Sequence, residues 1–273
     1  MLCHRIVWSL LVVALVVLAT RRTRAVVAVL RDPRTLGWLS LGAVFVAVNW
    51  GVYIAAVFDD QVVEASLGYF INPLVTIVLG VVVLHERLRT VQWVAVGIAS
   101  AAIVVLAVAY GSLPWIALVL ALSFGTYGLA KKRAGVDAVE SLTVETLVLT
   151  PPALVVLGVL GLVGSLSFAA HGAGHAALLA TAGVVTTVPL LAFGAAAKRL
   201  PLSTVGLLQY LTPVLQFVYG VAIAHESLPP ARLAGFVLVW VALVVLVADG
   251  WRAAHRNRRA APPAVLDPAD TAL

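Results

Sequence analysis

Polar side chains recur at helical spacing in two otherwise apolar stretches of this 273-residue chain. In the stretch 62–84, Tyr69, Asn72 and Thr76 fall within an arc of about 60° on a helix. In the stretch 203–224, a second set falls within an arc of about 80°. The members of this second set are Gln209, Thr212, Gln216 and Tyr219. Amides, hydroxyls and phenols donate and accept hydrogen bonds, so both stripes indicate recognition of a polar solute.

A third polar group lies in the stretch 36–57, where Asn49 and Tyr53 share a helix face and Trp50 is adjacent. We predict that these three side chains and the two stripes bind a substrate. The alternative for the stripes is interhelical hydrogen bonding, which contributes about 0.6–2 kcal/mol for each bond. The alternative for Trp50 and Tyr53 is a place in the aromatic belt at the membrane surface.

A proline accompanies each stripe, Pro73 in the first and Pro213 in the second. Proline removes a backbone N–H and clashes with the preceding helical turn, so it frees carbonyl groups that a cavity can use. We predict that both prolines are helix hinges beside the binding site.

Apart from Arg232 and Asp249, which lie at the ends of 231–249, the charged residues inside the predicted spans are Glu64 and Glu145. Each lies two residues from the edge of its span. Glu64 is a candidate carboxylate for coupling transport to a proton or another cation. The alternative is an ordinary solvated acid beside Asp59 and Asp60.

The pairs His85-Glu86 and His225-Glu226 lack the second histidine that a zinc-protease motif needs. We interpret them as polar caps of helix ends or as partners of neighbouring arginines. The single cysteine, Cys3, excludes an internal disulfide and a cysteine metal cluster. The sequence has no recognisable Ser-His-Asp set, phosphate-binding loop or dinucleotide fingerprint. We therefore predict a protein that is not an enzyme and needs no metal or other cofactor.

The composition determines the kind of elements that carry these residues. Hydrophobic residues make up 62% of the chain and charged residues 11%, which excludes a soluble domain because such domains are about one quarter charged. A helix needs about 20 apolar residues to cross a bilayer. Nine candidate stretches, of which the first is short, predict an all-α, multi-pass membrane protein; they are 6–20, 36–57, 62–84, 91–110, 112–130, 143–163, 175–197, 203–224 and 231–249.

Lysine and arginine are divided unequally between the two sides of this predicted topology. Sixteen lie in the loops of one side and in the C-terminal tail, whereas only Arg5 and Arg232 lie on the other. Because cytoplasmic loops carry the excess of positive charge, we predict a cytoplasmic C-terminus and an external N-terminus. Topology thus explains the formal net charge of +6, and nucleic acid is not expected as a partner.

An internal repeat relates the two halves of the chain at a constant offset of 140 residues. Eight pairs are identical between the regions around the two prolines; they are Leu67/Leu207, Pro73/Pro213, Val78/Val218, Gly80/Gly220, Val81/Val221, His85/His225, Glu86/Glu226 and Leu88/Leu228. The same offset relates the first four predicted spans to the last four and leaves 112–130 without a counterpart. The repeat unit is therefore five helices, and an odd number inverts the second copy across the membrane.

The repeat predicts three regions. Residues 1–110 form a first repeat that lacks its first helix, 111–250 form the second repeat, and 251–273 form a disordered cytoplasmic tail. We expect an upstream helix that completes a ten-helix protein with two inverted halves. If this expectation holds, the genomic sequence before Met1 encodes, in frame, a further apolar run of about 20 residues.

Several motifs resemble one known family over about residues 3–250. The most specific is the run Glu64-Ala-Ser-Leu-Gly-Tyr-Phe-Ile-Asn-Pro-Leu74, and it is supported by His4-Arg-Ile-Val-Trp-Ser9, Asn49-Trp50, Glu86-Arg-Leu88 and Tyr110-Gly-Ser-Leu-Pro-Trp115. These residues are similar to the RarD family of EamA-type permeases in the drug/metabolite transporter superfamily. The resemblance implies ten helices in two inverted five-helix halves in the bacterial inner membrane, and it supplies no catalytic residues.

We therefore expect an inner-membrane secondary transporter or permease that moves a small organic solute by rocking of the two repeats within the lipid bilayer. Because no charge lies deep in a predicted span, a neutral, zwitterionic or amphiphilic solute is favoured over a multiply charged one. The alternative class is a non-transporting membrane scaffold or sensor, which needs no polar groups near the midplane.

Overall fold

A computed structural model describes residues 2–59, 61–110, 115–163, 172–212 and 214–215, with 233, 237–238, 240–242, 244–245 and 248. Within these helices, the side chains at 62–64, 66, 106–107, 109–110, 173 and 175 are not described. Every regular element in the described ranges is a helix. The helices are α1 (Leu2–Ala19), α2 (Thr23–Arg31), α3 (Pro33–Phe58), α4 (Val62–Leu84), α5 (Thr90–Tyr110), α6 (Trp115–Ala134), α7 (Ala138–Leu162), α8 (Gly172–Arg199) and α9 (Leu202–Gln209).

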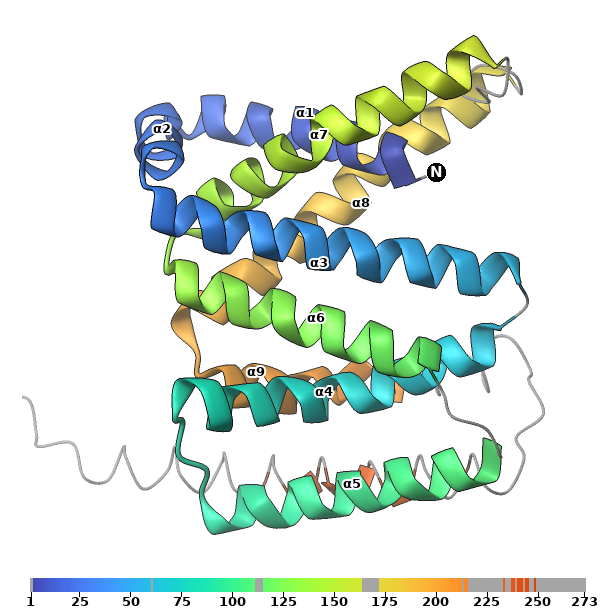
Figure 1. Cartoon of the computed structure of the whole chain (residues 1–273). Coiled ribbons are helices and arrows are strands. Elements are labelled where there is room, and N and C mark those ends of the chain that lie inside the picture. Colours follow the sequence, from blue (N-terminus) through green and yellow to red (C-terminus); the bar gives the residue numbers. More distant parts are fainter. Residues whose placement is uncertain are drawn as a thin grey trace, which may run out of the picture.

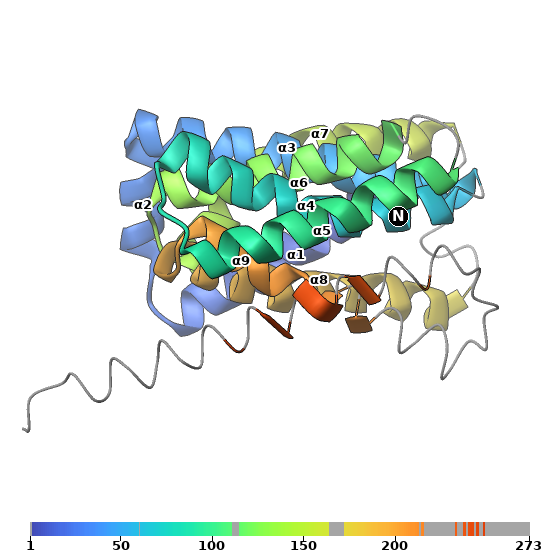
Figure 2. The same ribbon diagram turned by 90° about the horizontal axis from the view of Figure 1, so that it is seen from below.

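The long helices run side by side as a bundle (Figures 1 and 2). Helix α1 packs against α7 and α8, α3 packs mainly against α6 and also α7, and α4 packs against α6 and α9. Helix α5 lies at the edge of the bundle against α4 (Figure 1). The turns from α1 to α2, α4 to α5, α6 to α7 and α8 to α9 all lie at one end, on the left of Figure 1.

The described helices have the length and composition of membrane spans. Five stretches within them are long and apolar enough to cross a bilayer; they are Leu2–Ala19, Pro33–Phe58, Leu67–Leu84, Ala138–Leu162 and Ala176–Arg199. Large apolar side chains point outward, as shown by Leu162 at 91% exposed and Val108 at 75% exposed. Small ones such as Ala99 and Ala117 are completely buried. This arrangement suits lipid outside and close helix packing inside.

Helix α2 differs from the sequence prediction, which treats residues 21–35 as a loop. It is a nine-residue helix, too short to cross a bilayer, and its Val26 is buried while Arg24 is exposed. The helix packs against α7 and α3. The next helix, α3, begins at Pro33 with the side chain of Asp32 as its cap, because that carboxylate accepts a hydrogen bond from the backbone N–H of Arg34.

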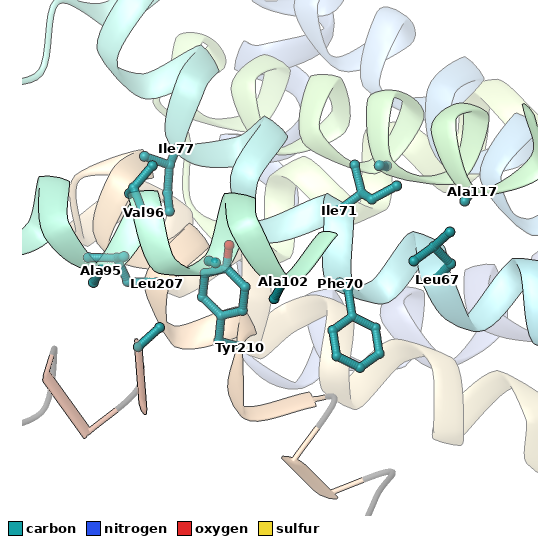
Figure 3. Packing of buried hydrophobic residues seen from close by; sticks show 13 residues of the cluster. Leu67, Phe70, Ile71, Ile77, Ala95, Val96, Ala102, Ala117, Leu207 and Tyr210 are labelled. Atoms are coloured by element: carbon teal, nitrogen blue, oxygen red, sulfur yellow. The ribbon is translucent and has the colours of Figure 1, made fainter. Parts of the chain in front are cut away.

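Apolar side chains from α4, α5, α6 and the end of α9 form one core of the bundle (Figure 3). Figure 3 shows Ile77 beside Val96, with Leu207 and Tyr210 close by. The ring of Tyr210 is 1% exposed, and Ile77 is also 1% exposed. This core holds α9 against the proline-containing half of α4.

Two glycines allow helices to cross at close range. A Cβ atom at Gly206 in α9 would lie 2.8 Å from Ile77 Cγ1 and 2.9 Å from the carbonyl oxygen of Pro73 in α4. A Cβ atom at Gly183 in α8 would lie 2.7 Å from the backbone of Trp8 in α1. Only a residue without Cβ fits at either crossing.

We expect Gly206→Ala to lower the free energy of unfolding by about 1–3 kcal/mol, because the added methyl group must push α9 away from α4. Unfolding of the purified protein in mixed detergent micelles measures this change. Gly37→Ala is the matched control, since a Cβ atom at this position in α3 meets nothing within 4 Å. Equal stability of the two variants would contradict the close crossing of α4 and α9.

Candidate functional site

A cavity of about 300 Å³ lies among four helices. Its lining combines polar and aromatic side chains from α1, α3, α4 and α6; the residues are Arg5, Asn49, Trp50, Tyr53, Ala65, Gly68, Tyr69, Asn72, Leu120 and Phe124. Five of the residues that the sequence predicts for substrate binding are therefore brought together here: Asn49, Trp50, Tyr53, Tyr69 and Asn72. A space of this size accepts a small organic molecule.

The two predicted polar stripes meet where α4 crosses α9. The Asn72 side-chain amide donates a hydrogen bond of 3.3 Å to Gln209 Oε1, and the Thr76 hydroxyl lies 3.3 Å from the same oxygen. The Thr76 hydroxyl also donates to the backbone carbonyl of Asn72 at 2.9 Å. Thr76 is completely buried, so it belongs to the helix crossing and not to the wall of the cavity.

Asn72 belongs both to the crossing and to the cavity wall. Its Oδ1 atom is buried and has no hydrogen-bond partner in the described part of the chain, and the same holds for Gln209 Nε2. A buried amide group without a partner is unfavourable by about 1–3 kcal/mol. One acceptor and one donor thus remain without a partner at the crossing of α4 and α9.

Two cavity residues of α3, Asn49 and Tyr53, contact the neighbouring helices α6 and α4. Asn49 donates hydrogen bonds to the backbone carbonyl of Leu120 at 2.8 Å and to Ser123 Oγ at 3.1 Å, both in α6. The rings of Tyr53 and Tyr69 meet edge to face with their centroids 6.2 Å apart. These contacts place Asn49 and Tyr53 at the α3–α6 and α3–α4 contacts, beside the cavity.

Arg5 is the cavity residue that the sequence prediction missed. Its guanidinium lies over the Trp50 ring, 4.2 Å from the ring centroid, and its Nε donates a hydrogen bond of 2.6 Å to Thr186 Oγ1 in α8. From the sequence, Arg5 is expected in an outer loop because the apolar run begins at Ile6. The helix instead begins at Leu2, so Arg5 lies in its first turns. The sequence feature that indicates this earlier helix start is the absence of any helix breaker between Leu2 and Ile6.

Several predicted site residues cannot be placed. Gln216, Tyr219 and the predicted hinge Pro213 lie outside the described residues, as does the side chain of Glu64. Thr212 is described and exposed, beyond the end of α9. The other predicted hinge, Pro73, lies inside α4, and its carbonyl oxygen faces the α9 crossing at Gly206.

A second polar cluster links α6 and α7 away from this cavity. Lys131 Nζ and Glu145 Oε1 are 2.8 Å apart, and the two side chains are only 3% and 2% exposed. Glu145 also accepts hydrogen bonds from the Tyr127 hydroxyl at 3.1 Å and from Ser141 at 2.9 Å. Lys131 further donates to Ser141 Oγ at 2.8 Å. Every one of these polar groups has a partner, so the cluster forms a closed network.

Exposed and half-buried charges connect the helices at the end where α2 lies. Arg22 bonds to Glu140 and Asp137, and Asp137 is also paired with Lys198 in α8. Hydrogen bonds from Lys198 and then Arg22 lower the pKa of Asp137 below its ordinary value. Because the pKa of Asp137 is lowered in the folded state, these contacts are complete at neutral pH and weaken only as the pH falls into the acid range.

Glu86 fixes the start of α9 at the same end. Its two carboxylate oxygens accept hydrogen bonds from the backbone N–H groups of Leu202 at 2.7 Å and Ser203 at 2.8 Å. The carboxylate therefore neutralises the positive end of the α9 dipole. The interpretation of Glu86 as a cap is confirmed, although it caps another helix than its own. His225 and Glu226 lie outside the described residues.

The comparisons with known proteins agree on one family. The model of the EamA-like transporter family matches residues 1–108 and 113–248. A protein named RarD from Streptomyces exfoliatus is 57% identical over 268 residues, which cover 97% of this chain and 85% of that protein. A protein named RarD from Escherichia coli strain K12 is 40% identical, over 91% of this chain and 84% of that protein.

Two further matches extend this result. An uncharacterized transporter from Vibrio cholerae is 41% identical, over 95% of this chain and 86% of that protein. One solved crystal structure has a TM-score of 0.64 at 18% identity, covers 89% of this chain and 86% of its own, and therefore shows a shared fold. Long apolar helices, the two matched stretches and these relatives lead to one assignment: the chain is a multi-pass membrane protein that belongs to the EamA-like transporter family, among the RarD permeases.

Proposed function

We propose that this chain is an inner-membrane secondary transporter whose small organic solute binds in the cavity between α1, α3, α4 and α6. The observation that carries the proposal is the cavity itself, about 300 Å³ in volume and lined by Arg5, Asn49 and Asn72 among aromatic rings. An ionisable side chain such as that of Arg5, when it faces the interior of a membrane bundle, is by default a candidate for a solute or ion pathway.

We propose two inverted halves, residues 1–110 and 111–250, that rock about this cavity. The helix bounds support such a repeat, because α4 begins at Val62 and α9 begins 140 positions later at Leu202. Helix α3 shifted by 140 positions becomes 173–198, and α8 spans Gly172–Arg199. The pairs α1–α7 and α4–α9 are related by the same offset and pack against each other, which supports a pseudo-twofold axis between them.

The basic residues support an orientation with the α2 end in the cytoplasm. Arg22, Lys131, Lys198 and their neighbours lie near the turns at that end of the bundle, and the C-terminal tail carries four further arginines. The cavity residues Tyr53 and Tyr69 lie nearer to the turn between α3 and α4. In this orientation, the solute site lies in the outer half of the protein.

Cysteine labelling tests the orientation. In a Cys3→Ser background, which removes the native thiol, we expect Asp59→Cys to react with an impermeant maleimide added to intact cells. Arg24→Cys should react only after permeabilisation, since its exposed side chain lies on α2. Both positions are exposed, so accessibility within the protein is matched. The reverse labelling pattern would contradict the orientation and the inverted repeat.

Uptake into proteoliposomes tests the function. A panel of radiolabelled metabolites is offered with and without a pH gradient, and we expect at least one small organic solute to accumulate. A dependence of uptake on the gradient, lost in Glu64→Gln, would assign Glu64 to coupling. Failure of every solute under both conditions, with correctly folded protein, would favour a membrane scaffold or sensor.

A further inference from the structure

Two donor groups of the Arg5 guanidinium have no partner among the residues that the structure describes. Its Nε bonds to Thr186, and one face of the group is covered by Trp50. No hydrogen bond or ion pair from its two terminal amino groups is found within the described part of the chain. The buried Lys131 differs from Arg5, because a carboxylate oxygen of Glu145 lies 2.8 Å from its Nζ.

A positive charge inside a membrane bundle requires compensation. Transfer of an unpaired charge out of water is strongly unfavourable, so such groups pair with an anion or remain in contact with water. The lining of the cavity contains no acidic side chain among the residues that the structure describes. The half-buried Arg5 is therefore left by the described lining to water or to an anion that enters the cavity.

The geometry of the Arg5 guanidinium favours one kind of anion. With Nε used by Thr186, the two terminal amino groups present a planar edge with two parallel donors. This edge matches the two oxygens of a carboxylate. A single guanidinium balances a single negative charge, whereas a phosphate monoester carries nearly two.

The other residues that line the cavity indicate the chemistry of the rest of the solute. Trp50, Tyr53, Tyr69 and Phe124 line a space of about 300 Å³, and the polar residues Asn49 and Asn72 belong to the same wall. We propose that Arg5 is the anion-binding residue of the cavity and that its solute is a small monocarboxylate with an aromatic or apolar body. This inference rests on the proposed transport function. It agrees with the sequence-based preference for a neutral, zwitterionic or amphiphilic solute over a multiply charged one, and it narrows that preference to an amphiphilic monocarboxylate.

Matched acids and amides test the proposal. The probes are benzoate, 3-phenylpropanoate and indole-3-acetate, each compared with its own amide at pH 7.5 by titration calorimetry on the purified full chain in detergent. Acid and amide have nearly the same shape and differ in charge. We expect at least one acid to bind at least tenfold more tightly than its amide.

Variants then assign the effect to Arg5. Arg5→Gln should weaken binding of the acid at least tenfold and leave the amide within twofold. Arg5→Lys keeps the charge without the planar edge and should give an intermediate loss. Thr186→Val frees Nε without removing the charge, and it should weaken binding of the acid several-fold. This variant keeps the test valid if Arg5→Gln does not fold. Arg24→Gln, at an exposed arginine of α2, is the control and should change neither probe.

Three results would overturn the proposal. They are equal affinity of every acid and its amide, acid binding that is unchanged in Arg5→Gln, and absence of binding by all three acids at 10 mM. Acid binding that appears only in Glu64→Gln would also overturn it, because Glu64 would then be the anion at Arg5. Transport of an uncharged solute by the protein in proteoliposomes would overturn the carboxylate proposal while leaving the transport function in place.

Discussion

Replacing Glu145 by glutamine is expected to destabilise the protein by about 3–5 kcal/mol. The substitution leaves the ammonium group of Lys131 in a site that is 3% exposed, without the carboxylate that now lies 2.8 Å away. Glutamine also places an amide where Tyr127 and Ser141 both donate to a carboxylate oxygen. The free energy of unfolding in mixed detergent micelles measures this loss.

The double variant Lys131→Met with Glu145→Met distinguishes loss of the ion pair from loss of side-chain packing. Replacing both members of a buried ion pair by apolar residues of similar volume is often neutral, so most of the stability should return. Lys198→Gln is the control for an exposed ion pair and should have a small effect, because the side chains of Lys198 and Asp137 are both exposed and solvent screens their contact. If the double variant is no more stable than Glu145→Gln alone, the pair is not the source of the effect.

Asn72→Leu should reduce uptake per folded molecule at least tenfold. Leucine has a similar size but removes the amide that lines the cavity and donates to Gln209 at 3.3 Å. One hydrogen bond to the solute worth about 1.4 kcal/mol corresponds to a factor of ten in affinity. Loss of the interhelical bond alone should lower the free energy of unfolding by only about 0.6–2 kcal/mol.

Gln209→Leu should have the same stability cost but a smaller effect on uptake, because Gln209 touches the cavity only through Asn72. Thr181→Val is the matched control, since the exposed Thr181 hydroxyl bonds only to Leu178 of its own helix. Uptake of the solute identified in the panel is measured with protein quantified after folding. A large loss of stability with normal uptake per folded molecule would assign Asn72 to helix packing alone.

Several parts of the site follow from the sequence because they depend on local spacing. Tyr69 and Asn72 share one face of α4 by helical periodicity, and Asn49 and Tyr53 share one face of α3. A polar group that faces lipid is unfavourable, so these faces must turn inward whatever the arrangement of the helices. The structure places all four beside one cavity.

Other parts depend on distances that no local pattern contains. The sequence offers both a solute-binding and a packing role for the stripes, and the crossing at Gly206 brings Asn72 against Gln209 while Thr76 is buried between helices. The pairing of Lys131 with Glu145 depends on how α6 and α7 meet after the turn at Gly135. Hydropathy treats each of these charges as a helix end and does not predict its partner.

The sequence alone therefore determines that this protein is a multi-pass helical membrane protein, which stretches are apolar, and which helix faces are polar. These properties depend on the transfer of each segment from water to lipid, and that free energy is a sum over neighbouring residues. Only the tertiary structure places Arg5 over Trp50 and brings Glu86 to the first residues of α9. The physical reason is that such contacts join residues from different helices, and their distances depend on the positions at which those helices cross.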